Sequence, residues 1–368
     1  MSKNSKDIVF VAAQRSAIGR YKGIYKDLQA HNLGSLVIKS LIEKTKLKVD
    51  EIDEVILGQV LTGSCGQNPA RQAAINSGIP KEKTAIIINQ VCGSGLRSIV
   101  NGYQSLLTNS ANFIIAGGQE SMTNSIQDQM MKDGLTDAFY NYHMGVTAEN
   151  VAAKYNISRQ EQDEFALQSQ QKANLAINKK KFDDEIINDD IDEHPRTGIT
   201  INDLSKLNSV FKEKGTVTPG NSSGINDGAA AVVLTTRELA EKNNLEILGK
   251  IISWATCGVD PSMMGLGPIP SSNKALEIAK WNVKDLDLIE INEAFAAQSI
   301  AVIKELKIPK EKVNVNGGAI ALGHPIGASG ARIVVTLLNE LKKMNGKKSL
   351  ATLCIGGGMG ISMCIEKD

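Results

Sequence analysis

The sequence has few aromatic residues, almost no net charge and no long apolar run. Phe, Tyr and Trp make up only 4% of the 368 residues, so the chain offers few rings on which nucleic-acid bases could stack. Its formal net charge of +1 provides no broad basic field for a nucleic acid. No apolar stretch approaches the length of a membrane span. We therefore expect no nucleic-acid partner and no membrane partner.

Cysteine is also scarce, and the five cysteines stand far apart in the sequence: Cys65, Cys92, Cys257, Cys354 and Cys364. An odd number without the spacing of metal ligands favours reduced thiols over a disulfide framework or a metal site. The start of the chain is polar, and the apolar run at residues 8–11 is too short for the core of a signal peptide. These features predict a cytoplasmic protein without a metal.

Short apolar runs alternate with helical patterns through most of the chain, which is typical of α/β proteins. The chain is too long for a single core, so we expect two or three domains. The order of elements in the first part returns near the end. The strand-like run at residues 313–316 and the helix from Ala328 repeat the strand and helix around Cys92, and residues 350–358 repeat residues 113–118. We predict duplicated α/β halves with mostly parallel sheets.

The middle of the chain, residues 119–224, is more polar and separates the two halves. We interpret it as an inserted loop domain that covers the active site. The N-terminal half then comprises residues 1–118 and 225–247, and the C-terminal half comprises residues 248–368.

Cys92 stands between the apolar run 85–88 and a helical pattern that starts near Leu96. The free N–H groups and the dipole at a helix N-terminus stabilise a thiolate, so this position makes Cys92 a candidate nucleophile. Gly93 and Gly95 leave the backbone open to a substrate. A small cysteine packed beneath the helix is the alternative.

Three later stretches carry further candidates. Asn292 begins residues 292–298 and is either a functional amide or a helix cap. His324 lies in a glycine-rich apolar loop, where a structural histidine is the alternative. Cys354 precedes the glycine-rich residues 355–360, whose exposed N–H groups suit an oxyanion. No P-loop pattern is present, which argues against a nucleoside triphosphate site.

Together these motifs resemble the signatures of thiolases, most closely those of the biosynthetic branch. The likeness covers the whole chain in order and rests on residues 90–96, 292–295, 323–327 and 354–358. It implies a five-layered αβαβα arrangement of duplicated α/β halves with an inserted loop domain. It also implies acetyl-CoA C-acetyltransferase activity, the reversible Claisen condensation of two acetyl-CoA to acetoacetyl-CoA and CoA. A 3-ketoacyl-CoA thiolase and a non-catalytic acyl-CoA-binding protein are the alternatives.

The resemblance also assigns catalytic roles. Cys92 takes the acetyl group as a thioester after His324 has activated it. His324, with a water held by Asn292, forms one oxyanion hole, and the N–H groups of Cys92 and Gly356 form the other. Cys354 removes the α-proton of the second acetyl-CoA. These groups cover the chemistry without a metal or redox cofactor, so we expect none besides the CoA thioesters.

The same likeness implies substrate contacts. The residues that match the short-acyl pocket are His143, Met144 and Phe295. The residues that match CoA contacts are Leu135, Arg196 and Ser223, whereas Asp203 replaces a CoA-contacting serine of the relatives. A guanidinium such as that of Arg196 suits phosphate or stacks on adenine.

Two stretches, near residues 121–131 and 187–196, are shorter than in typical relatives. The first lacks the loop used for tetramer contacts. The resemblance therefore implies a homodimer and leaves a tetramer open.

Overall fold

The computed structural model describes residues 4–188 and 190–368, and its strands form one ten-stranded sheet. The strands are β1 (Ile8–Arg15), β2 (Gly19–Arg20), β3 (Glu54–Gly58), β4 (Thr84–Ile88), β5 (Phe113–Ser121), β6 (Asn226–Thr236), β7 (Gly249–Gly258), β8 (Leu288–Ile291), β9 (Lys348–Ile355) and β10 (Met359–Glu366). Their order is β4-β3-β5-β6-β1-β7-β10-β9-β8, and β2 pairs with β6.

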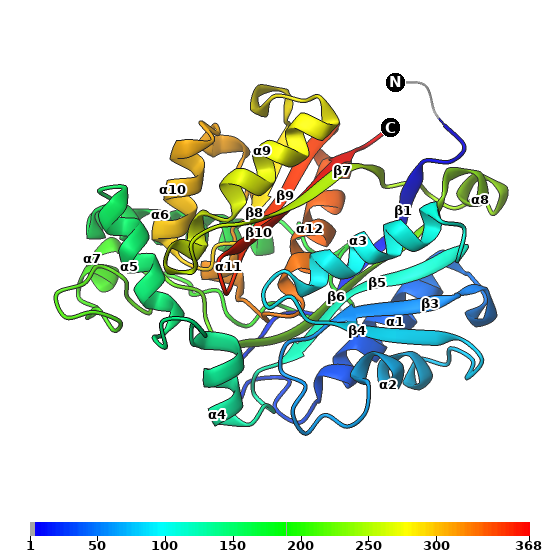
Figure 1. The fold of residues 1–368 in the computed structure, drawn as a ribbon, viewed down its shortest axis with the longest axis horizontal. Helices are drawn as coiled ribbons and strands as arrows, with labels where there is room; N and C mark the ends of the chain where they lie inside the picture. Colours follow the sequence, from blue (N-terminus) through cyan, green and yellow to red (C-terminus); the bar gives the residue numbers. More distant parts are fainter. Residues whose placement is uncertain (1–3, 189) are drawn as a thin grey trace.

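Helices surround this sheet (Figure 1). The α-helices are α1 (Ala30–Thr45), α2 (Pro69–Asn76), α3 (Ser94–Leu107), α4 (Gln127–Gln129), α5 (Met144–Lys154), α6 (Arg159–Asn178), α7 (Ile201–Ser205), α8 (Arg237–Lys242), α9 (Pro268–Ala279), α10 (Ala296–Glu305), α11 (Ala319–Leu322) and α12 (Ser329–Met344). The remaining short helices are η1 (Val49–Glu51), η2 (Met130–Leu135), η3 (Pro261–Leu266), η4 (Val283–Asp285) and η5 (Lys310–Lys312).

The sheet has the same organisation on both sides of its centre. From the centre outward, the first half runs β1, β6, β5, β3, β4 and the second runs β7, β10, β9, β8. The halves meet where β1 and β7 pair over two residues each. The strand expected at residues 313–316 is reduced to a bridge between Ile289 and Val313. The duplication predicted from the order of motifs is therefore present in the strand order.

The prediction of mostly parallel sheets is wrong, because six of the nine strand pairings among the described residues are antiparallel. After the long excursion, β6 inserts antiparallel between β1 and β5. The strands β9 and β10 form a hairpin through residues 356–358, and a hairpin can join only antiparallel neighbours. Alternating strands and helices along the chain do not reveal such pairings.

The helices α3 and α12 pack against each other between the two halves (Figure 1). Glycines permit this close approach, since a Cβ on Gly330 would lie 2.4 Å from the backbone N of Leu96. The helices α1 and α2 cover the other face of the first half, and α9 and α10 cover that of the second. The chain thus has the five αβαβα layers that its likeness implied. The central packing brings the loop before α3 close to the loop before α12.

The excursion between β5 and β6 lies on the left in Figure 1 and packs against the C-terminal half through α5 and α6. A capping box between Ser158 and Glu161 marks the start of α6. The strand β5 continues to Ser121, three residues past the predicted border of the loop domain. The domain boundaries stay a prediction.

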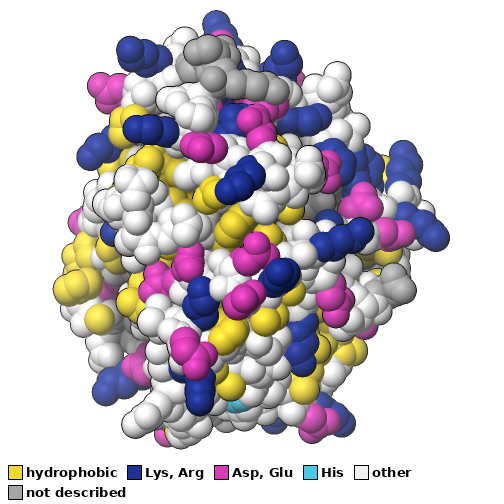
Figure 2. All heavy atoms as spheres, turned by 90° about the vertical axis from the view of Figure 1, so that its right-hand side faces the viewer, with side chains coloured by type: hydrophobic (Ala, Val, Ile, Leu, Met, Phe, Trp, Pro, Cys, Tyr) yellow, Lys and Arg dark blue, Asp and Glu magenta, His cyan; other side chains and the backbone are white. Residues whose placement is uncertain are grey.

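Two features of the described residues bear on partners. No helix in this part of the chain combines the length and the apolar character that crossing a membrane requires. Figure 2 shows acidic and basic side chains interspersed over one face of the molecule, without a continuous field of one sign.

Candidate active site

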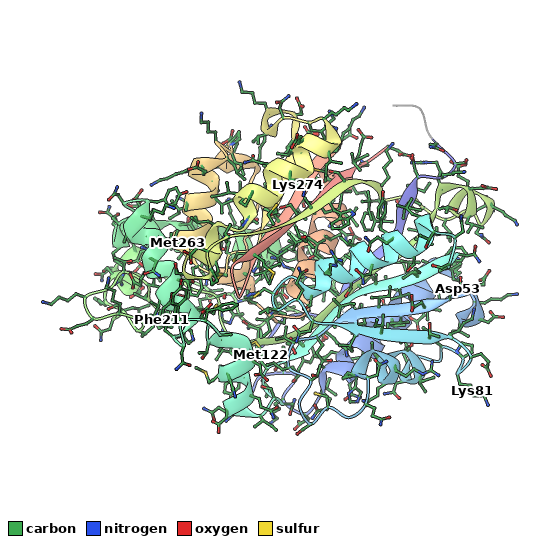
Figure 3. All side chains as sticks on the ribbon, viewed as in Figure 1. Asp53, Lys81, Met122, Phe211, Met263 and Lys274 are labelled. Atoms are coloured by element: carbon green, nitrogen blue, oxygen red, sulfur yellow. The ribbon has the colours of Figure 1, made fainter. Side chains whose placement is uncertain are left out.

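A cavity of about 320 Å³ lies where the excursion meets the loops before α3 and α12. Nine of the eleven predicted site residues line it: Cys92, Leu135, His143, Met144, Arg196, Ser223, Phe295, His324 and Gly356. The other two, Asn292 and Cys354, are buried. In Figure 3, the lining residues Met122 and Phe211 belong to the excursion. Asp53 and Lys81 mark the opposite end of the first half. The structure therefore brings together residues that are up to 264 positions apart in the chain, from Cys92 to Gly356.

Cys92 reaches the cavity through a sharp turn between β4 and α3. Val91 has a φ of 47°, which is costly for a β-branched residue and marks local strain. The Ser94 hydroxyl holds the turn, because it accepts the N–H of Gln90 at 2.9 Å and donates to the Val91 carbonyl at 2.6 Å. Gly93 is the N-cap of α3, so Cys92 lies just before the helix, as predicted.

Proximity to the helix terminus does not by itself set the pKa of Cys92. Burial, with a smaller contribution from the charge of Glu120, raises this pKa to about 11. The backbone N–H groups of Gly356 and Cys92 hydrogen-bond the thiol and lower its pKa, but burial outweighs them. The thiol is therefore protonated at neutral pH and needs a base before it can attack.

The hydrogen bonds of His324 define which ring nitrogen is free. Nδ1 lies 2.5 Å from the hydroxyl oxygen of Ser329, and that hydroxyl donates its own hydrogen to the Pro325 carbonyl at 2.9 Å. Nδ1 is therefore the donor in its contact with Ser329, and Nε2 carries the lone pair. The His324 backbone N–H is held by Asn226 Oδ1 at 3.0 Å, which fixes the loop that carries the ring.

Burial lowers the pKa of His324 to about 3, and the charge of Arg332 acts in the same direction. The imidazole is therefore neutral at pH 7. A neutral imidazole with a free Nε2 can accept a proton, as a general base must.

Asn292 is not a helix cap, since α10 begins at Ala296 with Phe295 as its N-cap. Its amide Nδ2 faces the His324 Nε2 at 3.4 Å. Its Oδ1 is buried and has no hydrogen-bond partner among the described residues. A buried amide oxygen without a partner can accept a hydrogen bond from a small polar group.

Cys354 lies near the end of β9 and is fully buried in a cluster with Met144, Met264 and Phe295. It is absent from the cavity lining but packs directly behind it, since Met144, Met264 and Phe295 of its cluster line the cavity. Burial raises the pKa of Cys354 well above its usual range, and the nearby Cys92 raises it further. The two thiols thus share one apolar environment.

Aromatic rings close one side of the cavity. The rings of His143 and Phe211 are stacked with centroids 4.5 Å apart, and Phe211 meets Phe295 edge-on at 6.3 Å. His143 is also the N-cap of α5, because its Nδ1 accepts the N–H of Gly145 at 3.0 Å. These rings limit the space for an acyl group.

The predicted CoA-side residues lie toward the mouth of the cavity. Arg196 is exposed there, and its backbone N–H is held by Gln170 at 2.8 Å. Ser223 is fixed through its N–H to the carbonyl of Ala294 at 3.0 Å. Asp203 does not line the cavity, and its carboxylate instead caps α7 in a capping box with Thr200.

Sequence reasoning missed Glu120. Its fully buried carboxylate accepts the N–H groups of Val60 at 3.0 Å, Leu61 at 3.2 Å and Gly327 at 2.9 Å. It therefore joins the loop after β3 to the loop that follows His324. Burial raises the pKa of Glu120 to about 7, against the lowering effect of the three N–H groups.

Sequence reasoning also missed Phe211, Met264 and the orienting role of Ser329. Phe211 lies outside any helix or strand, so periodicity gave no signal for it. Ser329 was visible in the sequence five residues after His324, a spacing at which a side chain can reach back to a loop.

Among the described residues, no group of three or more His, Cys, Asp or Glu side chains could hold a metal ion.

Comparison with known proteins covers nearly the whole chain. The family model described as "Thiolase, N-terminal domain" matches residues 8–129 and 124–238, and "Thiolase, C-terminal domain" matches residues 245–367. An acetyl-CoA acetyltransferase of Rhizobium meliloti (strain 1021) is 51% identical over 391 aligned residues, which cover 99% of this chain and all of the relative. That alignment is longer than this chain, so the relative carries residues that this chain lacks.

Solved structures give the same result. The crystal structure of the Bacillus anthracis acetyl-CoA acetyltransferase has a TM-score of 0.95 at 39% identity and covers 99% of this chain and 100% of that chain. The structure of human mitochondrial 3-ketoacyl-CoA thiolase in complex with CoA has a TM-score of 0.95 at 40% identity, with coverage of 99% and 98%.

Proposed function

Because the chain belongs to the thiolase family, we propose that it is an acetyl-CoA C-acetyltransferase. It is an acyltransferase that joins two acetyl-CoA molecules reversibly into acetoacetyl-CoA and CoA. The observation that carries this proposal is the meeting of Cys92, His324 and Gly356 in one cavity with the aromatic wall of a small acyl pocket.

In the first half-reaction, Cys92 attacks the thioester carbonyl of acetyl-CoA. His324 Nε2 takes the thiol proton, which the pKa of Cys92 near 11 makes necessary. The tetrahedral oxyanion lies against the backbone N–H groups of Cys92 and Gly356. Collapse of this intermediate breaks the carbon–sulfur bond to CoA, and the leaving thiolate receives the proton from His324. The product is acetyl-Cys92.

In the second half-reaction, Cys354 gives its thiol proton to the free Nε2 of His324, and the resulting thiolate removes an α-proton from a second acetyl-CoA. The negative charge that develops on the thioester oxygen is stabilised by the Nε2–H that His324 has gained and by a water on Asn292 Oδ1, which has no other hydrogen-bond partner among the described residues. The carbanion attacks the acetyl carbon of acetyl-Cys92, and the leaving Cys92 thiolate takes the proton from His324. The reaction uses no metal or redox cofactor, because thiols, imidazole and N–H donors supply every proton transfer and charge contact.

The aromatic wall of the cavity favours acetyl and acetoacetyl groups over long chains. The rings of His143, Phe211 and Phe295 pack on one another and line the same cavity as Cys92. A 3-ketoacyl-CoA thiolase acting on longer chains is the alternative, and it has support from the 40% identity to the human mitochondrial enzyme of that name.

A chain-length series tests the proposal. Thiolysis of acetoacetyl-CoA by CoA should proceed with kcat/KM higher than that of 3-ketohexanoyl-CoA or 3-ketodecanoyl-CoA. Rates that rise with chain length favour the alternative, and absence of turnover on all three substrates rejects both enzymatic functions.

We also propose that the chain acts as a homodimer in the cytoplasm. The strand β4 is the outer edge of the sheet and pairs only with β3 among the described strands. Ile86 in its middle is 44% exposed, and an exposed apolar edge strand invites pairing with another chain. All five cysteines are free thiols, which suits a reducing compartment.

A further inference from the structure

A second cavity adjoins the candidate active site at its mouth. Its volume is about 510 Å³, and its lining residues are Arg20, Tyr21, His194, Arg196 and Ile225. Three of these residues, His194, Arg196 and Ile225, also line the cavity that contains Cys92. The two cavities therefore meet in one space, with the reacting groups at one end and two arginines at the other.

The far end of this space carries two guanidinium groups that no carboxylate pairs directly. Neither Arg20 nor Arg196 has a side-chain hydrogen bond or ion pair with any of the residues that the structure describes. The acidic side chain beside them, Glu193, already accepts the backbone N–H groups of Arg20 at 2.8 Å and Ile24 at 3.1 Å. Two guanidinium groups without a carboxylate partner are typical of a site for phosphate, which they bind through paired N–H groups.

His194 indicates that both charges act on the same place. Burial and, to a smaller extent, the charges of Arg196 and Arg20 lower its pKa to about 4, against the raising effect of Glu193 and Asp192. It is therefore neutral at pH 7. Its Nδ1 lies 3.3 Å from the amide nitrogen of Asn226, whose Oδ1 holds the backbone of His324. The Asn226 side chain therefore connects His194, beside the two arginines, to the loop that carries His324.

We propose that Arg20 joins Arg196 in binding the phosphate groups of the CoA nucleotide, with the exposed ring of Tyr21 available to the adenine. The proposal rests on the proposed function, because CoA is the substrate that carries both a reactive thioester and a phosphorylated nucleotide. Tyr21 is 38% exposed, and the Lys22 ammonium lies 5.2 Å from its ring centroid, so the ring surface outside that contact is available for stacking. Arg20 and Tyr21 precede the excursion, so this half of the site comes from the N-terminal half of the fold.

Calorimetric titration with adenosine 3′,5′-diphosphate tests this assignment without any turnover. The variant R20Q removes the charge and keeps a long polar side chain. The matched control is K26Q, because Lys26 is an exposed cation of the same loop that does not line the cavity. We expect the Kd to rise about tenfold in R20Q, as for the loss of one charge-assisted hydrogen bond, and to change less than twofold in K26Q. No binding to the wild type, or equal weakening in both variants, overturns the assignment.

A parallel titration with inorganic phosphate separates the nucleotide from a free anion. Adenosine 3′,5′-diphosphate should bind more tightly than phosphate, and equal affinity overturns the nucleotide assignment.

Turnover then separates this proposal from the proposed function. The ratio of kcat/KM for acetoacetyl-CoA to that for acetoacetyl-pantetheine should fall about tenfold in R20Q and stay constant in K26Q. A ratio that is the same in R20Q and wild type rejects the role of Arg20 while the activity stands. Tight nucleotide binding that R20Q weakens, in a wild type without turnover, rejects the activity while the role of Arg20 stands.

Discussion

Replacing Ser329 by Ala removes the acceptor that orients the ring of His324. In the structure, His324 Nδ1–H donates to Ser329 Oγ at 2.5 Å, and this bond keeps Nε2 unprotonated. Without it, the buried ring either leaves an N–H unsatisfied or moves its proton to Nε2. The first result destabilises the tautomer that carries the base, and the second removes the base that Cys92 needs.

The size of the effect follows from the burial of the pair. Both side chains are at least 95% buried, so water does not replace the lost partner. An unsatisfied buried donor costs about 1–3 kcal/mol. Since about 1.4 kcal/mol corresponds to a factor of ten, kcat/KM for thiolysis of acetoacetyl-CoA should fall roughly 5- to 150-fold.

The assay needs a control that separates orientation of the ring from loss of a hydroxyl. Ser98 is a suitable match, because it is fully buried and its hydroxyl donates to the carbonyl four residues earlier, as that of Ser329 does. S98A should lose stability without the drop in kcat/KM. The rate of Cys92 alkylation by iodoacetamide, measured against pH, should change in S329A and not in S98A. Unchanged kcat/KM and alkylation in a folded S329A protein refute the role of Ser329.

Three further predictions follow from the buried groups. C354A should still exchange acetyl groups between acetyl-CoA and labelled CoA. Its rate of condensation should fall at least about 100-fold, as for the loss of a general acid–base. Loss of the exchange reaction contradicts the role assigned to Cys354. Because folding lowers the pKa of His324 from 6.5 to about 3, the wild type should lose unfolding free energy on acidification from pH 6.5 to 5 relative to H324N in denaturant titrations, with a slope that approaches about 1.4 kcal/mol per pH unit near pH 5. Because folding raises the pKa of Glu120 from 4.5 to about 7, the opposite sign applies: the stability of the wild type relative to E120Q should fall as the pH rises through that range, and parallel curves refute the shift.

Local patterns were sufficient where local physics decides the structure. The glycine-flanked turn at Cys92 and the repeated strand order could be predicted from residue types and spacing. The resemblance of four motifs then identified the residues that meet in the cavity, although they are distant in the sequence.

Features that depend on contacts between distant parts of the chain could not be predicted from the sequence. The antiparallel insertion of β6 is decided by the return of the chain after a hundred residues, and alternating strands and helices carry no sign of it. The pKa of Cys92 depends on the burial of the whole site, whereas the sequence showed only the helix that follows. The contributions of Phe211 and Glu120 arise from loops and strands that meet only in the fold.

The acetylation of Cys92 tests the central claim most directly. Intact-mass spectrometry of the wild type mixed with acetyl-CoA should show the added mass of one acetyl group, and C92A should show none. The same adduct on C92A contradicts the assignment of the nucleophile. Absence of an adduct on a folded wild type contradicts the acyl-enzyme mechanism itself.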